Sequence, residues 1–433
     1  MDLCIVGAGH VGLVTGACFA DLGHAVLMVD VDRRRIAELQ RGRVWFYEPG
    51  LEELVRRNLR EGRLRFTTNL AQAVKQSLVI FICVGTPPKD GGAADLSFVE
   101  DVAHQVAKAM PGYRLIVEKS TVPVQTGRKI TQTISNARRK NVPFDVASNP
   151  EFLREGSGIH DFLHPDRIVL GVESKRARQL LEKLYGAFAA PLVVTDISSA
   201  ELIKHASNSF LAVKISYINS IAAVCDRVGA DVVKVAEGMG LDPRIGRAFL
   251  DAGVGFGGFC LPKDIAAFIR IAEEIGYDFA LLKAAERVNH EQPRAFVAGA
   301  KEALWVLSNK TIGVLGLAFK PNTDDLRYAP PLEVIRLLQA EGARITAYDP
   351  QAMPEARRML TGVRFGADPY AAARGADALA VLTEWNEFQE LNFTKLKSLM
   401  RQPVILDGRN VYDPERLRRL GFRYVGIGRG TRA

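Results

Sequence analysis

A single cysteine in a glycine-rich segment is the residue best suited to covalent chemistry. The segment GVGFGGFCLPKD, residues 253–264, places Cys260 directly after a run of glycines and four residues before Asp264. A lone cysteine is usually a small buried apolar residue. Glycines, however, permit close backbone contact with a phosphate or sugar, and a packing cysteine needs neither them nor a following carboxylate. The pattern therefore indicates a nucleophilic thiol in a binding loop.

The first residues carry a dinucleotide-binding pattern. Gly7, Gly9 and Gly12 form GxGxxG between an apolar strand and a helix, and Asp30 ends the next strand. The three glycines permit the turn, the approach of a diphosphate and close helix packing, in that order. Asp30 is suited to the ribose hydroxyls and repels a 2′-phosphate, which favours NAD over NADP. The cluster 33–35 (Arg-Arg-Arg) leaves NADP open, because arginine accommodates a phosphate.

The two motifs together define a reaction type. An alcohol needs only a base and a hydride acceptor, whereas an aldehyde must add a nucleophile before hydride can leave. A thiolate at Cys260 supplies that nucleophile, and the adduct then becomes a thioester that water hydrolyses. The sequence therefore predicts oxidation to the level of a carboxylic acid, with a two-step route from an alcohol left open.

Two pairs of polar residues are spaced four apart. Lys204 and Asn208 share a face of a long predicted helix, and Glu151 and Glu155 share one if SNPEFLREG is helical. A solvated helix face explains such spacing equally well. By spacing alone we prefer that interpretation for both pairs.

The motifs are positioned by alternating strands and helices. Apolar runs separated by segments of helical period predict a doubly wound α/β domain over residues 1–196. The segments VGTPP and STVP follow two of its strands, where parallel sheets bind ligands, although turn chemistry also explains them. A helix from Ser198 to Gly229 opens a helical domain, 197–300, and strands return in a second α/β domain, 301–433, which lacks a full GxGxxG. The predicted fold is thus α/β, with two Rossmann-like domains joined by a long central helix and a helical middle domain.

Composition limits the partners and the compartment. The net charge of +8 comes from scattered basic residues without interleaved aromatics, which favours a small anionic ligand over nucleic acid. Five cysteines without a CxxC pair predict neither disulfides nor a metal site, and a reducing cytoplasm fits them. The apolar stretch 3–20 contains four glycines and is better explained by a strand and turn than by a membrane span.

Nine segments in order resemble the UDP-glucose 6-dehydrogenases, within the wider family of nucleotide-sugar dehydrogenases. They are GAGHVG, YEPGLEEL, STVPVQTG, SNPEFLREG, ELIKHASNSFLAVKISYINSIA, DPRIG, GFGGFCLPKD, AFKPNTDDLR and DGRNVYD, and the resemblance covers residues 1–430. It implies four-electron oxidation of UDP-glucose at C6 to UDP-glucuronate, with two NADH released. It also implies an NAD-binding first domain, a dimer through the central helix, and a UDP-sugar-binding last domain.

The resemblance implies roles residue by residue. Cys260 would be the nucleophile, Lys204 and Asn208 would stabilise oxyanions, Glu151 and Asp264 would handle protons and water, and Thr121 would position that water. The implied cofactor contacts are Gly7, Gly9, His10, Val11, Gly12, Asp30, Arg35, Thr86, Thr121, Glu155, Lys263 and Arg327. The implied substrate contacts are Glu151, Phe152, Leu153, Lys204, Asn208, Phe249, Leu250, Gly253, Phe256, Gly257, Lys320 and Arg409, with Arg244 a candidate from a partner subunit.

Two positions depart from the family pattern. Phe259 precedes the cysteine where the family usually has serine, and VWFYEPG replaces the usual Pro-Ile before Tyr-Glu-Pro-Gly. Because Phe259 could narrow the pocket beside the thiol, a dehydrogenase of GDP-mannose or a UDP-N-acetylhexosamine stays an alternative. An NAD-binding sensor without turnover is a further alternative, which the presence of Lys204, Asn208, Cys260 and Asp264 disfavours.

Overall fold

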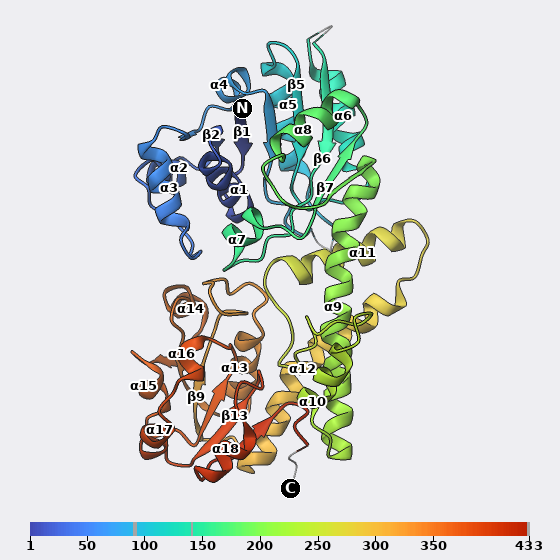
Figure 1. The fold of residues 1–433 in the computed structure, drawn as a ribbon. Coiled ribbons are helices and arrows are strands. Elements are labelled where there is room, and N and C mark those ends of the chain that lie inside the picture. Colours follow the sequence, from blue (N-terminus) through green and yellow to red (C-terminus); the bar gives the residue numbers. More distant parts are fainter. Residues whose placement is uncertain (90–92, 140–141, 431–433) are drawn as a thin grey trace. The chain divides into compact units, whose positions relative to one another are not determined.

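The computed structural model describes residues 1–89, 93–139 and 142–430 and divides into two compact units (Figure 1). Unit 1 comprises Met1–Ser207 and Ala266–Tyr277, and unit 2 comprises Asn208–Ile265 and the chain from Asp278 onward. Each unit contains one mainly parallel sheet, which confirms the predicted fold class. The domain boundaries after residues 196 and 300 stay a prediction.

Unit 1 is built on an eight-stranded sheet. Its strands are β1 (Asp2–Val6), β2 (Ala25–Val29), β3 (Leu64–Thr67), β4 (Val79–Ile82), β5 (Arg114–Glu118), β6 (Phe144–Ser148), β7 (Ile168–Val172) and β8 (Leu192–Thr195). Its helices are α1 (His10–Asp21), α2 (Arg33–Gln40), α3 (Leu51–Arg60), α4 (Leu70–Gln76), α5 (Ser97–Ala109), α6 (Thr126–Ala137), α7 (Gly158–Leu163) and α8 (Lys175–Leu184). The order is β3-β2-β1-β4-β5-β6-β7-β8, with only β6 and β7 antiparallel. The order reverses between β1 and β4, where such sheets bind dinucleotides.

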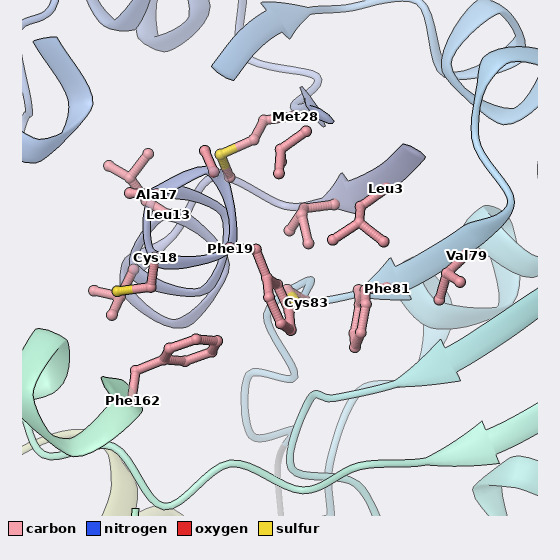
Figure 2. Close-up of a cluster of buried hydrophobic side chains, with 14 of the residues drawn as sticks. Leu3, Leu13, Ala17, Cys18, Phe19, Met28, Val79, Phe81, Cys83 and Phe162 are labelled. Carbon is pink, nitrogen blue, oxygen red and sulfur yellow. The ribbon is translucent and has the colours of Figure 1, made fainter. Parts of the chain in front are cut away.

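The inner strands of unit 1 are mainly apolar on both faces because helices cover both. In β1, Leu3 and Ile5 pack in the core that contains α1, whereas Cys4 and Val6 pack in the core that contains α5. Figure 2 shows the first of these cores, in which the Phe19 ring centroid lies 5.5 Å from that of Phe81. Burial on two faces explains why these strands appear in the sequence as continuous apolar runs.

Unit 2 is built on a six-stranded, entirely parallel sheet. Its strands are β9 (Thr311–Leu315), β10 (Arg344–Tyr348), β11 (Val363–Phe365), β12 (Ala378–Val381), β13 (Val404–Asp407) and β14 (Arg423–Gly426). Its helices are α10 (Val232–Gly240), α12 (Ala280–Leu304), α13 (Pro330–Ala340), α14 (Met353–Met359), α15 (Pro369–Ala373), α16 (Asn386–Gln389), α17 (Phe393–Leu399) and α18 (Pro414–Arg419). The order β11-β10-β9-β12-β13-β14 repeats the first six positions of the unit 1 sheet.

Two helices contribute residues to both units, α9 (Ile197–Val228) and α11 (Cys260–Glu274). The predicted long helix is confirmed, and Gly229, with φ +75°, ends it in the left-handed conformation that glycine adopts readily. By length and composition α9 could cross a membrane, and 44% of its most apolar window is buried. A core helix of a soluble protein meets the same criterion.

A buried carboxylate closes the first turn of the second sheet. Asp349 follows β10 as Asp30 follows β2, but Asp349 is 1% exposed. Its Oδ2 accepts hydrogen bonds from the backbone N–H groups of Leu317 and Ala318 and from Trp385 Nε1. Two more backbone N–H groups donate to its Oδ1. The oxygens of Asp349 are therefore all used by hydrogen bonds within the protein, whereas Asp30 accepts two backbone hydrogen bonds and is partly exposed.

We expect Asp349→Ala to lower the free energy of unfolding by about 3 kcal/mol, because the change leaves several buried donors without an acceptor. Urea denaturation followed by tryptophan fluorescence measures this, since Trp385 is buried in unit 2. Asp368→Ala is the control, because Asp368 caps α15 through one backbone N–H and should cost about 1 kcal/mol. Equal losses in the two variants would contradict the role given to Asp349.

Candidate active site

The glycine turn of unit 1 fits a dinucleotide. A Cβ atom on Gly7, whose φ is +104°, would lie 2.5 Å from the Cys83 carbonyl oxygen, and one on Gly12 would lie 1.9 Å from that of Gly7. A Cβ on Gly9 would meet no atom within 4 Å. The first and third glycines are thus required by packing, and the second leaves open space. Among the described residues no side chain caps the start of α1, so its first N–H groups can bind an anion.

The unusual segment VWFYEPG lies against this turn. Trp45 Nε1 donates to the Ala8 carbonyl oxygen at 3.3 Å, and the Phe46 ring centroid is 5.2 Å from that of His10. The guanidinium of Arg35 lies 4.3 Å from the centroid of the Trp45 ring. The substitution of the usual Pro-Ile therefore places two aromatic rings beside residues predicted to bind the cofactor.

The loops after β4 and β5 bring two predicted residues together. Thr86 Oγ1 donates to the Thr121 carbonyl oxygen at 2.9 Å. Two residues of α9 that sequence analysis missed hold the second loop: Glu201 accepts two backbone hydrogen bonds at the start of α6, at 2.6 and 2.7 Å, and His205 Nε2 donates to Val122 O at 2.7 Å. Charged or polar residues within an apolar helix were the available signal.

The interpretation of Glu151 and Glu155 as one helical face is wrong, because their segment is an irregular loop between β6 and α7. Glu151 Oε1 lies 3.1 Å from Lys204 Nζ, and both side chains are at most 5% exposed. Leu153 N donates to Glu151 Oε2 at 2.6 Å, and the Phe152 ring centroid is 5.4 Å from Lys204 Nζ. The preferred solvated face for Lys204 is therefore also wrong: the lysine forms a buried ion pair.

A second buried lysine fixes the start of this loop. Lys119 Nζ donates to Asn149 Oδ1 at 3.0 Å, and the Tyr185 hydroxyl donates to the same oxygen at 2.6 Å. Burial lowers the pKa of Lys119. Sequence analysis missed all three residues. Lys119 and Tyr185 both donate to Asn149, which lies two residues before Glu151.

Cys260 differs from the other four cysteines. Cys4, Cys18, Cys83 and Cys225 are buried, and burial raises the pKa of each thiol, that of Cys83 to about 12. Cys260 is partly exposed and is the first residue of α11. The N-terminus of a helix favours a thiolate. Accessibility and position therefore favour Cys260 as the nucleophile among the five.

Asp264 connects two other predicted residues of unit 2. Its Oδ2 accepts a hydrogen bond from Asn208 Nδ2 at 2.7 Å, and its Oδ1 is 2.6 Å from Lys263 Nζ. All three residues are at most 7% exposed. Asn208 is thus buried as well, against the preference from spacing.

Phe259 lies between two cations that were predicted to contact the cofactor. Lys263 Nζ is 5.6 Å from its ring centroid, and the Arg327 guanidinium is 4.3 Å away. Arg327 also pairs with Asp325 at 2.6 Å. The aromatic residue that replaces the usual serine therefore contributes cation–π contacts to both basic side chains.

The glycine-rich segment before Cys260 is held by Arg409 and by asparagines. Arg409 donates to the carbonyl oxygens of Gly255 at 3.0 Å, Phe319 at 3.1 Å and Leu382 at 2.9 Å. Gly253 N donates to Asn219 Oδ1, and Phe256 N to Asn289 Oδ1. A Cβ on Gly257 would lie 2.3 Å from the Tyr328 carbonyl oxygen. The backbone of this segment is therefore held in a fixed conformation by hydrogen bonds and close packing.

The remaining residues that were predicted to contact the substrate are not all in the same surroundings. Leu250 is buried, Phe249 has a left-handed backbone with φ +64°, and Lys320 Nζ lies 5.6 Å from the Phe319 ring centroid. Arg244 is instead 87% exposed and pairs with Asp242 after α10. The structure therefore gathers the predicted residues in two sets, one in each unit, and leaves Arg244 on the surface of unit 2.

Comparison with known proteins agrees with this geometry. Models of the UDP-glucose/GDP-mannose dehydrogenase family match the chain with the NAD binding domain over residues 1–189, the central domain over 198–291 and the UDP binding domain over 313–414. The chain is 47% identical to UDP-glucose 6-dehydrogenase TuaD of Bacillus subtilis, over 99% of this chain and 93% of that protein.

Solved structures give the same result. A UDP-glucose dehydrogenase from Pyrobaculum islandicum has a TM-score of 0.92 at 42% identity, covering 98% of this chain and 97% of that one. A UDP-D-ManNAc dehydrogenase from Pyrococcus horikoshii has a TM-score of 0.87 at 30% identity, covering 99% and 100%.

The NAD binding domain matched over residues 1–189 and the curated relatives show that the chain is an NAD-dependent dehydrogenase, which confirms the predictions of an enzyme and of its cofactor. More narrowly, the chain belongs to the UDP-glucose/GDP-mannose dehydrogenase family.

We expect Gly9→Ala to weaken NAD binding and Gly12→Ala to lower stability. Gly12→Ala should lower the free energy of unfolding by about 3 kcal/mol or more, because its Cβ would overlap backbone atoms. This is the cost of severe overpacking in a protein core. Gly9→Ala should fold normally and bind NAD at least about tenfold more weakly, because its methyl group would enter the space left for the diphosphate. Thermal melting and NAD calorimetry separate the two effects, and normal NAD affinity in Gly9→Ala would contradict the assignment.

Proposed function

We propose that this chain oxidises C6 of UDP-glucose to UDP-glucuronate and reduces two NAD per sugar. The observation that carries the proposal is Cys260, a partly exposed thiol at the start of α11, four residues before the buried Asp264. The greater identity to proteins named for UDP-glucose, 42–47% against 30% for the UDP-D-ManNAc dehydrogenase, supports this sugar.

The first oxidation requires a base for the C6 hydroxyl. Glu151 and Asp264 are the two candidate carboxylates, and each is buried and already bonded to a cation, Lys204 and Lys263 respectively. Bound NAD accepts the two electrons of each oxidation as hydride. The O–H proton leaves to a carboxylate as the C6–H bond breaks, and the product is an aldehyde.

The second oxidation requires Cys260. The thiolate adds to the aldehyde carbon, and donors such as Lys204 and Asn208 stabilise the oxyanion that forms. Loss of hydride from this thiohemiacetal gives a thioester. Water positioned by Thr121 then attacks the acyl carbon, the C–S bond breaks, and the carboxylate and the thiolate are released.

The sugar nucleotide is assigned to unit 2. The glycine-rich segment 253–257 has little side-chain bulk to exclude a diphosphate or sugar, and Arg409 lies against it through the Gly255 carbonyl oxygen. Lys320 supplies a further positive charge in the same unit. The closed carboxylate of Asp349 supports a ligand other than a dinucleotide on this sheet, because it has no acceptor left for ribose hydroxyls.

A homodimer in the cytoplasm completes the proposal. Phe210, Tyr217 and Val224 are spaced seven residues apart on α9 and are 63%, 52% and 52% exposed. An apolar stripe with that spacing is typical of a helix that packs against another helix. Five free cysteines support a reducing compartment.

Cys260→Ala should lose acid production by at least about a thousandfold, because no other accessible thiol replaces the nucleophile. Residual NADH should come only from the alcohol-to-aldehyde step. The test incubates the folded variant with NAD and UDP-glucose, counts NADH and identifies the product by mass. Cys225→Ala, a buried cysteine of the same unit, should retain wild-type turnover.

Acid formed by Cys260→Ala at the wild-type rate, with two NADH per sugar, would show that the thiol only packs. The wild-type protein should give two NADH per UDP-glucose and much lower kcat/KM with GDP-mannose and UDP-N-acetylhexosamines. A preference for either of those sugars would contradict the substrate and leave the reaction type intact.

Lys320→Ala and Arg409→Ala should weaken UDP-glucose binding about tenfold or more and leave NAD binding unchanged, because a lost charge-assisted contact costs about 1.5–3 kcal/mol. Arg409→Ala should also lower the stability of unit 2, since three carbonyl oxygens lose their donor. Separate titrations of the two ligands on folded protein measure this. Equal losses for NAD and the sugar would contradict the division between the units.

A further inference from the structure

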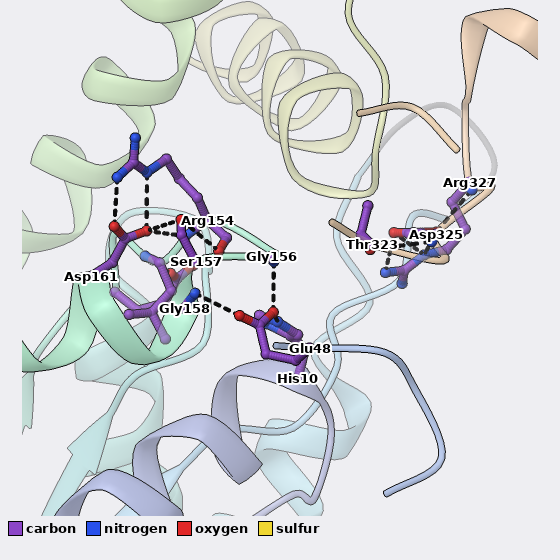
Figure 3. A network of polar contacts seen from close by, with 12 residues as sticks. His10, Glu48, Arg154, Gly156, Ser157, Gly158, Asp161, Thr323, Asp325 and Arg327 are labelled. Carbon is purple, nitrogen blue, oxygen red and sulfur yellow. Dashed lines mark hydrogen bonds and ion pairs between the residues drawn. The ribbon is translucent and has the colours of Figure 1, made fainter. Parts of the chain in front are cut away.

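A buried carboxylate that sequence analysis did not assign links three segments of unit 1 (Figure 3). The Glu48 side chain, from the segment FYEPG before α3, is fully buried. Its Oε2 lies 2.6 Å from His10 Nε2 and accepts a hydrogen bond from Gly156 N at 2.6 Å. Its Oε1 accepts from Gly158 N at 2.8 Å. One carboxylate therefore holds the start of α1, the loop after β6 and the start of α7.

The charge on His10 depends on this carboxylate. Burial opposes a charged imidazole, and so does the positive end of α1, of which His10 is the first residue. The hydrogen bond that the imidazole donates to Glu48 and the charges of Glu155, Glu48 and Glu151 outweigh burial, so the pKa of His10 is raised above 6.5. The Phe46 ring, which packs against the imidazole, brings no charge.

The position of His10 allows its positive charge to interact with a bound anion. The imidazole is 16% exposed at the helix end where backbone N–H groups can bind an anion. A cation at that point is unfavourable for the helix alone and becomes favourable when a diphosphate with two negative charges is bound. Glu48 neutralises the cation when the diphosphate is absent.

We propose that Glu48 is a positioning residue that holds a charged His10 for the diphosphate of NAD and fixes the loop carrying Glu151 and Glu155 to the same turn. Because one carboxylate serves both segments, the affinity for NAD and the placement of that loop are linked. The proposal rests on NAD as the cofactor and does not depend on the identity of the sugar.

The sign of the pH effect follows from the raised pKa. The diphosphate keeps its charge over the range tested, so NAD affinity should be greatest while His10 is protonated. It should fall as the pH rises through the pKa of His10, by up to about tenfold per pH unit until the imidazole is neutral.

The experiment measures NAD binding by calorimetry from pH 6 to 9, without sugar, so that turnover does not enter. The wild type should lose affinity across this range. His10→Gln should bind on the order of tenfold more weakly at pH 6 and show little pH dependence. His10→Lys should keep its affinity up to pH 8, because its charge does not titrate there. His160→Gln, an exposed histidine of α7, should behave as the wild type.

Glu48→Gln should shift the fall in affinity to lower pH, since the neutral amide no longer favours the imidazolium. His10→Gln retains the bonds of Glu48 to Gly156 and Gly158, so it decides the question even if Glu48→Gln does not fold. Wild-type affinity that does not vary with pH, or His10→Gln that keeps the wild-type profile, would overturn this proposal alone. Failure of the folded wild type to bind NAD at any pH would overturn the cofactor assignment with it.

Discussion

Four of the polar side chains buried on α9 determine where several segments of the candidate site lie. Glu201, Lys204, His205 and Asn208 are at most 7% exposed. A buried polar group costs free energy unless it has a hydrogen-bond partner, and a buried charge costs more. Each side chain is therefore paired with another segment of the chain: the start of α6, Glu151 in the loop after β6, the loop after β5, and Asp264 on α11. These segments are held in place because buried polar side chains on α9 would cost free energy without their hydrogen-bond partners.

The sequence was sufficient to predict those strands whose residues are almost completely buried. Strands covered on both faces are almost entirely apolar, as in β4 and in β1 after its first residue, and their runs predicted the sheets. The strands β3, β8, β11 and β14 were not predicted, because they are short edge or near-edge strands with partly exposed residues. A short alternating or mixed segment resembles a loop when its partner strand is unknown.

The candidate site was predictable where a motif is local. The glycine turn and Cys260 were found from short segments, whereas the burial of Lys204 and Asn208 was not, since four-residue spacing fits either face of a helix. Their partners, Glu151 and Asp264, lie 53 and 56 residues away in the chain. Glu48 escaped for the same reason, because its partners in the loop after β6 are more than 100 residues away.

The two sheets show that strand order alone does not determine which ligand a sheet binds. Both begin with the same strand order, and both turns start with a left-handed glycine, Gly7 and Gly316. The difference is local: an open Gly9 and a partly exposed Asp30 in one, and a saturated Asp349 in the other.

The uneven burial of the five thiols has a consequence for oxidative stress. A buried thiol with a raised pKa is inert towards peroxide and alkylating reagents, because both react with an accessible thiolate. Damage should therefore concentrate at Cys260 and proceed through a sulfenic acid that thiols can reverse, while the cores of both units stay intact. A cell under oxidation would then lose acid-forming activity before it lost folded protein, and could regain it without new synthesis.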